Sequence, residues 1–310
     1  MAPPAVSLNI HSGTHGAMTG RMLGAVEQVM LDERLDAVLI YGDTNSTLAG
    51  ALAAAKLHIP VAHVEAGLRS HNRRTPEEVN RILADRISHW LFTPTQLATD
   101  NLLAEDASAE QIHQVRDVMY DVALHHGAHA KQRSHVLETV GLGRGAYGLV
   151  TIHRAENADA PERLANIVDG LCMVAEGLDF VWPVHQRTLL ALEKAGPLKT
   201  LQERLTLIDP VGYLDMVALE QDAAVIVTDS GGVQKEAYFH GVPCVTVRDE
   251  TEWVELVDAG WNRLAPPHDA QSVADAIASA RGVWGWPVAP YGDGKSASRL
   301  RDRLVQGAIQ

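Results

Sequence analysis

The chain has 310 residues, of which 46% are hydrophobic and 21% charged, and its formal charge is −13. This length allows two domains with separate cores, and the composition is that of a soluble globular protein. The acidic charge argues against a nucleic-acid-binding protein, which needs a basic surface. No apolar run reaches the ~20 residues that span a bilayer, and no basic start precedes an apolar stretch, so we expect neither a membrane span nor a signal peptide.

Short apolar runs alternate with helical patterns in the first half of the chain. Apolar strands that alternate with amphipathic helices indicate a parallel sheet with crossover helices. The predicted strands are residues 37–41, 59–64 and 90–92, and the predicted helices include 47–57 and 78–87.

The histidines and cysteines are candidate metal ligands and disulfide partners. The spacing of His125, His126 and His129 can place two rings on one helical turn, but no cysteine or acidic partner lies close by. This favours a solvated helix end, and we predict no metal site. Cys172 and Cys244 lie in apolar stretches, which favours two buried thiols in a reducing cytoplasm over a disulfide.

The glycine-rich segment 141–148 suits an interdomain linker, and the alternation of strands and helices restarts after it. We therefore predict two doubly wound α/β domains that face a cleft. Residues 1–140 form the first domain and 149–295 the second. The second half contains a predicted helix at 161–176 and predicted strands at 149–152, 180–184, 205–208, 224–227 and 244–247.

Polar residues follow five of the predicted strands directly, where ligands of open α/β sheets bind. Asp43 and Glu65 each follow a strand, and Glu77 lies at a predicted helix start. Taken singly, these carboxylates suit an N-cap, an ion pair with Arg69 and the positive end of a helix, respectively. Taken together, they indicate an acid–base set.

The turn Ser230-Gly231-Gly232 lies between a predicted strand and a predicted helix. Glycines let the backbone approach a ligand, and the free N–H groups of the helix start favour an anion such as a diphosphate. Glu236 lies further into the helix, where a carboxylate can hold ribose hydroxyls. A tight connection with a capping serine explains the same turn without a ligand.

The ordered set of motifs resembles the UDP-N-acetylglucosamine 2-epimerase family of the glycosyltransferase-B fold. The order and approximate spacing agree from about Leu8 to the end of the chain. The matching stretches are 42–44, 63–69, 76–78 with 80–81, 153–154 with 156–157, 183–185, 228–234, 251–252 with 255, and 290–294.

The resemblance implies that UDP-N-acetylglucosamine is epimerised at C2 without a cofactor. The C2 proton is removed as UDP leaves C1, and UDP then adds back to the 2-acetamidoglucal while a proton arrives at the opposite face of C2. The resemblance also implies a homodimer, and a last helix, within residues 296–310, that returns to the first domain. By position it assigns catalysis to Asp43, Glu65, Glu77 and His153, and substrate or UDP binding to Arg69, Arg154, His185, Ser230, Gly231, Gly232 and Glu236.

Three features depart from the family pattern. The glycine-rich opening segment with Gly-Thr-Arg-Pro-Glu has no counterpart before Leu8, so we expect an incomplete first domain. Trp253 stands where an Arg-Pro pair is common, which resembles the branch that acts on UDP-2,3-diacetamido-glucuronate. Arg116 stands where Gly is usual, and we expect strain if that turn needs a positive φ.

Four alternatives to the reversible epimerase remain open from the sequence. They are the diacetamido-glucuronate epimerase, a hydrolysing 2-epimerase, a glycosyltransferase and an inactive UDP-sugar-binding homologue. All four share the fold and the nucleotide site. The sugar that is turned over separates the first alternative, and the fate of the C2 proton and of UDP separates the other three.

Overall fold

The computed structural model describes residues 4–195 and 198–307, and the chain divides into two compact units. The first unit combines residues 1–118 with 290–310, and the second is 119–289. The predicted linker at 141–148 is wrong: this segment lies inside the second unit. Its glycine turn is tied down there, because Gly145 N donates to Asp222 O at 2.7 Å and strand β5 begins at Tyr147.

The first unit contains a four-stranded parallel sheet in the order β1-β2-β3-β4. The three predicted strands are present, whereas β4 was not predicted because it has only three residues and no apolar run. The strands are β1 (Val38–Tyr41), β2 (Val61–Val64), β3 (Trp90–Thr93) and β4 (Ile112–Gln114).

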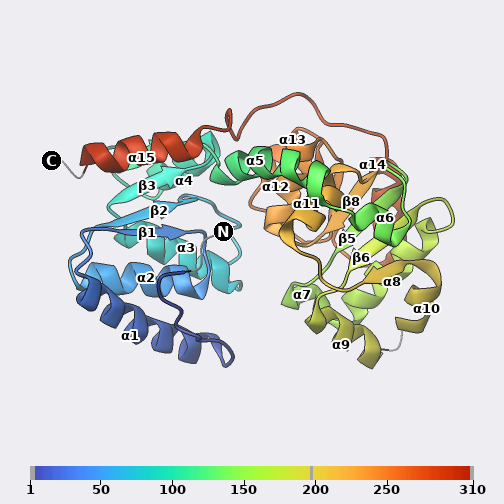
Figure 1. Cartoon of the computed structure of the whole chain (residues 1–310), viewed down its shortest axis with the longest axis horizontal. Helices are drawn as coiled ribbons and strands as arrows, with labels where there is room; N and C mark the ends of the chain where they lie inside the picture. Colours follow the sequence, from blue (N-terminus) through green and yellow to red (C-terminus); the bar gives the residue numbers. More distant parts are fainter. Residues whose placement is uncertain (1–3, 196–197, 308–310) are drawn as a thin grey trace. The chain divides into compact units, whose positions relative to one another are not determined.

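Helices pack on both faces of this sheet (Figure 1). Successive side chains of β2 point to opposite faces: Val61 packs with residues of the helices before and after β2, and Ala62 packs with Leu300 of the last helix. The last helix therefore belongs to the core of the first unit. The helices of this unit are α1 (His15–Glu33), α2 (Asn45–Lys56), α3 (Pro76–Ile87), α4 (Gln96–Ala104) and α15 (Ser296–Gly307).

The second unit contains a six-stranded parallel sheet in the order β10-β9-β8-β5-β6-β7. The chain starts in the middle at β5, proceeds to one edge, and returns to continue from β8 to the other edge. The reversal between β5 and β8 is the topological switch point at which such sheets bind ligands. The strands are β5 (Tyr147–Thr151), β6 (Asp179–Pro183), β7 (Thr206–Ile208), β8 (Val225–Thr228), β9 (Cys244–Thr246) and β10 (Asn262–Leu264).

Ten helices of the described residues cover this second sheet, and its core is large. Trp182 and Phe180 of β6 are buried among leucines and valines of the neighbouring helices. The helices are α5 (Val118–Arg133), α6 (Val136–Val140), α7 (Ala155–Ala158), α8 (Pro161–Val174), α9 (Gln186–Ala195), α10 (Leu198–Arg204), α11 (Tyr213–Gln221), α12 (Gly231–His240), α13 (Val254–Asp258) and α14 (Ala270–Ala280).

Two further expectations from composition can be compared with the structure. Cys172 is half-buried and Cys244 is buried, and both are free thiols in this structure. Within residues 4–195 and 198–307, no helix combines the length and the apolar character that crossing a membrane requires.

Candidate functional site

Asp43 lies directly after β1 and is held by a buried arginine. Arg81 of α3 donates to Asp43 Oδ2 at 2.5 Å and to Glu78 Oε2 at 3.2 Å. Glu78 in turn accepts hydrogen bonds from the backbone N–H groups of Ser70 and His71. Arg81 and Glu78 thus fix the position of the Asp43 carboxylate, which remains 27% exposed.

Glu65 lies directly after β2 with φ +69°, in the left-handed region that non-glycine residues rarely adopt. A Cβ atom placed on Gly42, at the end of β1, would lie 3.5 Å from Glu65 Oε2. The Glu65 carboxylate therefore lies over the end of β1, beside the residue that precedes Asp43. Such backbone conformations cost about 1–3 kcal/mol and cluster at functional sites.

Glu77 and Glu78 are adjacent in the first turn of α3 but differ in burial. Glu78 is 1% exposed and is used by the hydrogen bonds described above. Glu77 is half-buried, and its carboxylate has no hydrogen-bond partner among the residues that the structure describes. Of the two carboxylates, Glu77 is the one that these hydrogen bonds do not use.

A buried ionic network lies beneath these carboxylates and was missed by the sequence analysis. Asp85 of α3 accepts hydrogen bonds from His63 Nδ1 at 2.7 Å, Gly67 N at 3.1 Å and Arg69 Nη1 at 2.8 Å. Burial alone would lower the pKa of His63, but the hydrogen bond and charge of Asp85 outweigh it and raise that pKa above its ordinary value. Burial alone would raise the pKa of Asp85, but His63 and Arg69 outweigh this effect and lower that pKa.

Arg69, which the motif assigns to substrate binding, is buried and ion-paired. Its side chain is 1% exposed and pairs with both carboxylate oxygens of Glu105 at 2.7 Å, in addition to Asp85. The guanidinium is therefore used inside the first unit. It anchors the turn that follows β2, where Gly67 has φ +82° and a Cβ would lie 2.1 Å from Ala98 O.

In the second unit, one buried carboxylate organises the turn that follows β5. Asp229, which follows β8, accepts hydrogen bonds from His153 N at 3.1 Å, Arg154 N at 3.0 Å and Asn157 Nδ2 at 3.1 Å. Asp229 is fully buried. It connects the carboxyl ends of the two strands on either side of the switch point, and thereby fixes the backbone from which His153 and Arg154 project.

His153 is half-exposed and its Nδ1 lies 3.5 Å from Asp229 Oδ1. Burial lowers its pKa below the ordinary value, Asp229 opposes this, and the charges of Arg154, His185 and Arg187 lower it further. The ring is therefore mostly neutral at pH 7 in the free protein. A bound diphosphate would favour the charged form, because an anion raises the pKa of a nearby imidazole.

Ser230 caps the start of α12, its Oγ accepting from Val233 N. A Cβ atom on Gly231 would lie 3.5 Å from Trp253 Nε1 and 3.9 Å from Arg154 Nη2, so these side chains border the helix start. The first N–H groups of a helix lack intrahelical partners and favour an anion. Trp253 also stacks on Lys235, whose Nζ is 4.2 Å from the ring centroid.

Glu236 and His185 complete the predicted set in the second unit. Glu236, in the second turn of α12, is 8% exposed and accepts from Tyr213 Oη at 3.1 Å. Tyr213 is a site neighbour that sequence reasoning missed, because it follows β7 by five residues in a segment without a recognisable motif. The His185 ring is exposed and its centroid lies 6.3 Å from that of His153.

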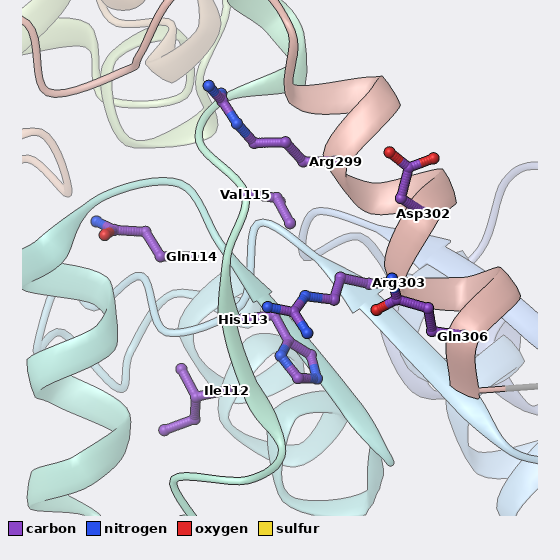
Figure 2. A pocket seen from close by; sticks show the side chains of 8 residues that line it. All are labelled: Ile112, His113, Gln114, Val115, Arg299, Asp302, Arg303 and Gln306. Carbon is purple, nitrogen blue, oxygen red and sulfur yellow. The ribbon is translucent and has the colours of Figure 1, made fainter. Parts of the chain in front are cut away.

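A cavity of about 460 Å³ lies elsewhere in the first unit, between β4 and α15 (Figure 2). The side chains of His113 and Arg303 lie next to each other there, and Arg303 lowers the pKa of His113 in the same direction as burial does. The lining contains none of the carboxylates at the ends of β1 and β2. It is therefore separate from the candidate site.

Fold and site together define the class of the protein. Two parallel α/β units carry polar residues at the carboxyl ends of their strands, and the second offers a glycine-rich helix start at its switch point. These features are typical of a nucleotide-binding protein.

Comparisons with known proteins agree with this class. The model of the family described as UDP-N-acetylglucosamine 2-epimerase matches residues 1–305. The UDP-2,3-diacetamido-2,3-dideoxy-D-glucuronate 2-epimerase of Pseudomonas aeruginosa is 48% identical over 307 residues, or 98% of this chain and 84% of that protein. The UDP-N-acetylglucosamine 2-epimerase of Methanocaldococcus jannaschii is 42% identical over 98% of this chain and 84% of its own length. A crystal structure of the M. jannaschii enzyme in complex with UDP-GlcNAc and UDP covers 99% of this chain and 86% of its own, with a TM-score of 0.93.

The chain belongs to the UDP-N-acetylglucosamine 2-epimerase family. The family and the glycosyltransferase-B class of fold predicted from the motifs are thereby confirmed, as is the expectation of an enzyme of the nucleotide-sugar epimerase class.

Proposed function

We propose that this chain catalyses the reversible C2 epimerisation of UDP-N-acetylglucosamine to UDP-N-acetylmannosamine. The observation that carries this proposal is the pair of neighbouring carboxylates at the ends of β1 and β2, with Glu65 held at φ +69°. A transferase has no need of such an acid–base pair, whereas proton transfer at C2 requires a base on one face and an acid on the other.

The residues of the site have different roles in this proposal. Asp43, Glu65 and Glu77 move the C2 proton and support that transfer. Gly231, Gly232 and Ser230 at the start of α12 bind the diphosphate through N–H and hydroxyl groups, Arg154 and His185 line the same site, and Glu236 binds the ribose. His153, as the imidazolium that a bound diphosphate favours, stabilises the negative charge that develops on UDP as the C1–O bond cleaves.

The exchange of the C2 proton with solvent tests the proposal directly. The chain is incubated with UDP-N-acetylglucosamine in D₂O, and C2 is followed by proton NMR. We expect deuterium at C2 and a manno-configured UDP-sugar. Glu65→Gln and Glu77→Gln should slow both by about 10²–10⁴-fold, the range for loss of a general acid or base.

The control is Glu138→Gln, because Glu138 is 83% exposed on α6 and belongs to none of the strand-end motifs. It should exchange at the wild-type rate. UDP binding without exchange in the wild type would contradict the proposal for this sugar. Free N-acetylmannosamine as the product would instead indicate a hydrolysing enzyme.

A second substrate is favoured by two observations. The P. aeruginosa relative named for the diacetamido-glucuronate sugar is 48% identical to this chain, and Trp253 borders the start of α12. An indole offers an apolar face in place of a cationic fork. Exchange at C2 is measured for UDP-2,3-diacetamido-glucuronate and for UDP-N-acetylglucosamine. The ratio of the two kcat/KM values decides between the two sugars.

A further inference from the structure

Helix α5 gathers three histidines that play no part in the proposed reaction. His125, His126 and His129 occupy positions i, i+1 and i+4. One ring nitrogen from each lies within 4.8 Å of the others. The His125 ring centroid is 4.9 Å from each of the other two, and those two are 6.2 Å apart. The rings therefore converge although the sequence spacing alone places only two of them on one turn.

A hydrogen bond sets the tautomer of one ring. His129 Nδ1 lies 2.8 Å from the carbonyl oxygen of His125, and because a carbonyl only accepts, Nδ1 carries the hydrogen. Nε2 of His129 is then the nitrogen with the free lone pair. Histidines that bind metals are commonly held in this way, with the second ring nitrogen donating to a backbone carbonyl.

The setting of His126 also suits a ligand. Its ring meets Tyr213 edge to face, with centroids 5.5 Å apart, and the Tyr213 hydroxyl is directed to Glu236 instead. The tyrosine ring therefore orients His126 by packing, and its hydroxyl group is engaged elsewhere.

We propose that His125, His126 and His129 bind one divalent transition-metal ion of the zinc class, with water in the remaining position. Imidazole nitrogens suit Zn²⁺, Cu²⁺ and Ni²⁺ better than Mg²⁺ or Ca²⁺, which prefer oxygen. Nitrogens bound to tetrahedral zinc at ~2.1 Å are about 3.4 Å apart. The rings must therefore close by roughly an ångström, which the exposed side chain of His125 permits. This revises the expectation of a solvated helix end.

The test is a calorimetric titration of Zn²⁺ into the full chain, without an affinity tag and freed of metal by a chelator that is then removed. We expect one saturable site. Substituting Co²⁺ should give the visible absorption of a four-coordinate ion. His125→Ala and His129→Ala should each weaken Zn²⁺ binding about tenfold or more. Alanine has a higher helix propensity than histidine, so both variants should fold.

The matched control is His268→Ala, since His268 is a 73% exposed histidine beside Asp249 in the same unit. It should bind Zn²⁺ as the wild type does. The absence of saturable binding to the wild type would overturn the proposal. Wild-type affinity in both His125→Ala and His129→Ala would overturn it equally, as would an equal loss in His268→Ala.

Discussion

Each unit contains a buried aspartate that holds a site-forming turn, but the two are neutralised by different means. Asp85 in the first unit accepts from Gly67 N and is paired with two cationic side chains, Arg69 and His63. Asp229 in the second unit accepts from two backbone N–H groups and the amide of Asn157, with His153 only at 3.5 Å.

The difference shows two ways to make a buried carboxylate tolerable. Opposite charges interact strongly in a low-dielectric interior, but each ion loses its hydration, so removal of one partner leaves the other uncompensated. A neutral N–H dipole stabilises the carboxylate less per contact than an opposite charge does. Because two of these N–H groups belong to the backbone of the site-forming turn, the same hydrogen bonds also fix the position of that turn. We therefore expect loss of Asp85 to reduce mainly the stability of the protein, and loss of Asp229 to reduce mainly its activity.

The largest effect is expected for Asp85→Ala, which should lower the free energy of unfolding by about 3–5 kcal/mol, the cost of leaving a buried charge unpaired. Arg69 would then keep only Glu105, and His63 would lose its carboxylate partner. Urea denaturation measures the change. Asp100→Ala is the matched control, because Asp100 is an exposed aspartate of α4 in the same unit; a loss as large in this variant would show that the network is unimportant.

Asp229→Ala tests the other half of the comparison. The N–H groups of His153 and Arg154 lose their acceptor, but both residues are partly exposed, so water can replace it. We expect a loss of about 1–3 kcal/mol in stability. The exchange rate at C2 should fall more than in Asp85→Ala measured at a temperature where both are folded. If the two variants lost the same stability and the same exchange rate, the different roles expected for Asp85 and Asp229 would be contradicted.

The pH dependence of stability sharpens the contrast. The folded-state pKa of His63 is raised above its ordinary 6.5, so its contribution is fully present below pH 6.5 and is lost as pH rises through the raised pKa. The free energy of unfolding should fall over that window by at most about 1.4 kcal/mol per pH unit. For Asp85 the folded-state pKa is lowered, so its contribution is lost as pH falls through that value.

His63→Gln provides the measurement, because glutamine does not titrate. Urea denaturation of both proteins from pH 6 upward should show a steeper decline in the wild type. Parallel curves would show that His63 does not carry a raised pKa.

The smallest effect concerns Arg116, whose φ of +78° confirms the strain expected at a position where Gly is usual. Arg116 also packs on Gly292 and donates to Pro290 O at 3.2 Å. Arg116→Gly and Arg116→Ala both lose these side-chain contacts, but only Ala keeps the left-handed penalty. We expect the Gly variant to be more stable by about 1 kcal/mol in urea denaturation.

Arg86 in the last turn of α3 supplies the control pair, since it is exposed and helical. There the order should reverse, with Arg86→Ala more stable than Arg86→Gly by up to about 1 kcal/mol. The same order at both positions would remove backbone strain as the explanation.

The sequence by itself determined the parallel α/β class and eight of the ten strands described, because apolar runs bounded by glycine and polar residues are local signals. It also determined the family, through motifs at strand ends such as Asp43 and Ser230-Gly231-Gly232. The short strands β4 and β10 carry no such run, and their pairing depends on neighbours far away in the chain.

Only the tertiary structure decided what each polar side chain does. Arg69 and Glu78 stand in the motif beside Glu65 and Glu77, yet burial turns the first two into supports. The boundary between the units, the Tyr213 contact to Glu236 and the convergence of three histidines on α5 are also tertiary outcomes. The physical reason is the same in each case: hydrogen-bond partners and burial are properties of residues brought together in space, and spacing along the chain does not contain them.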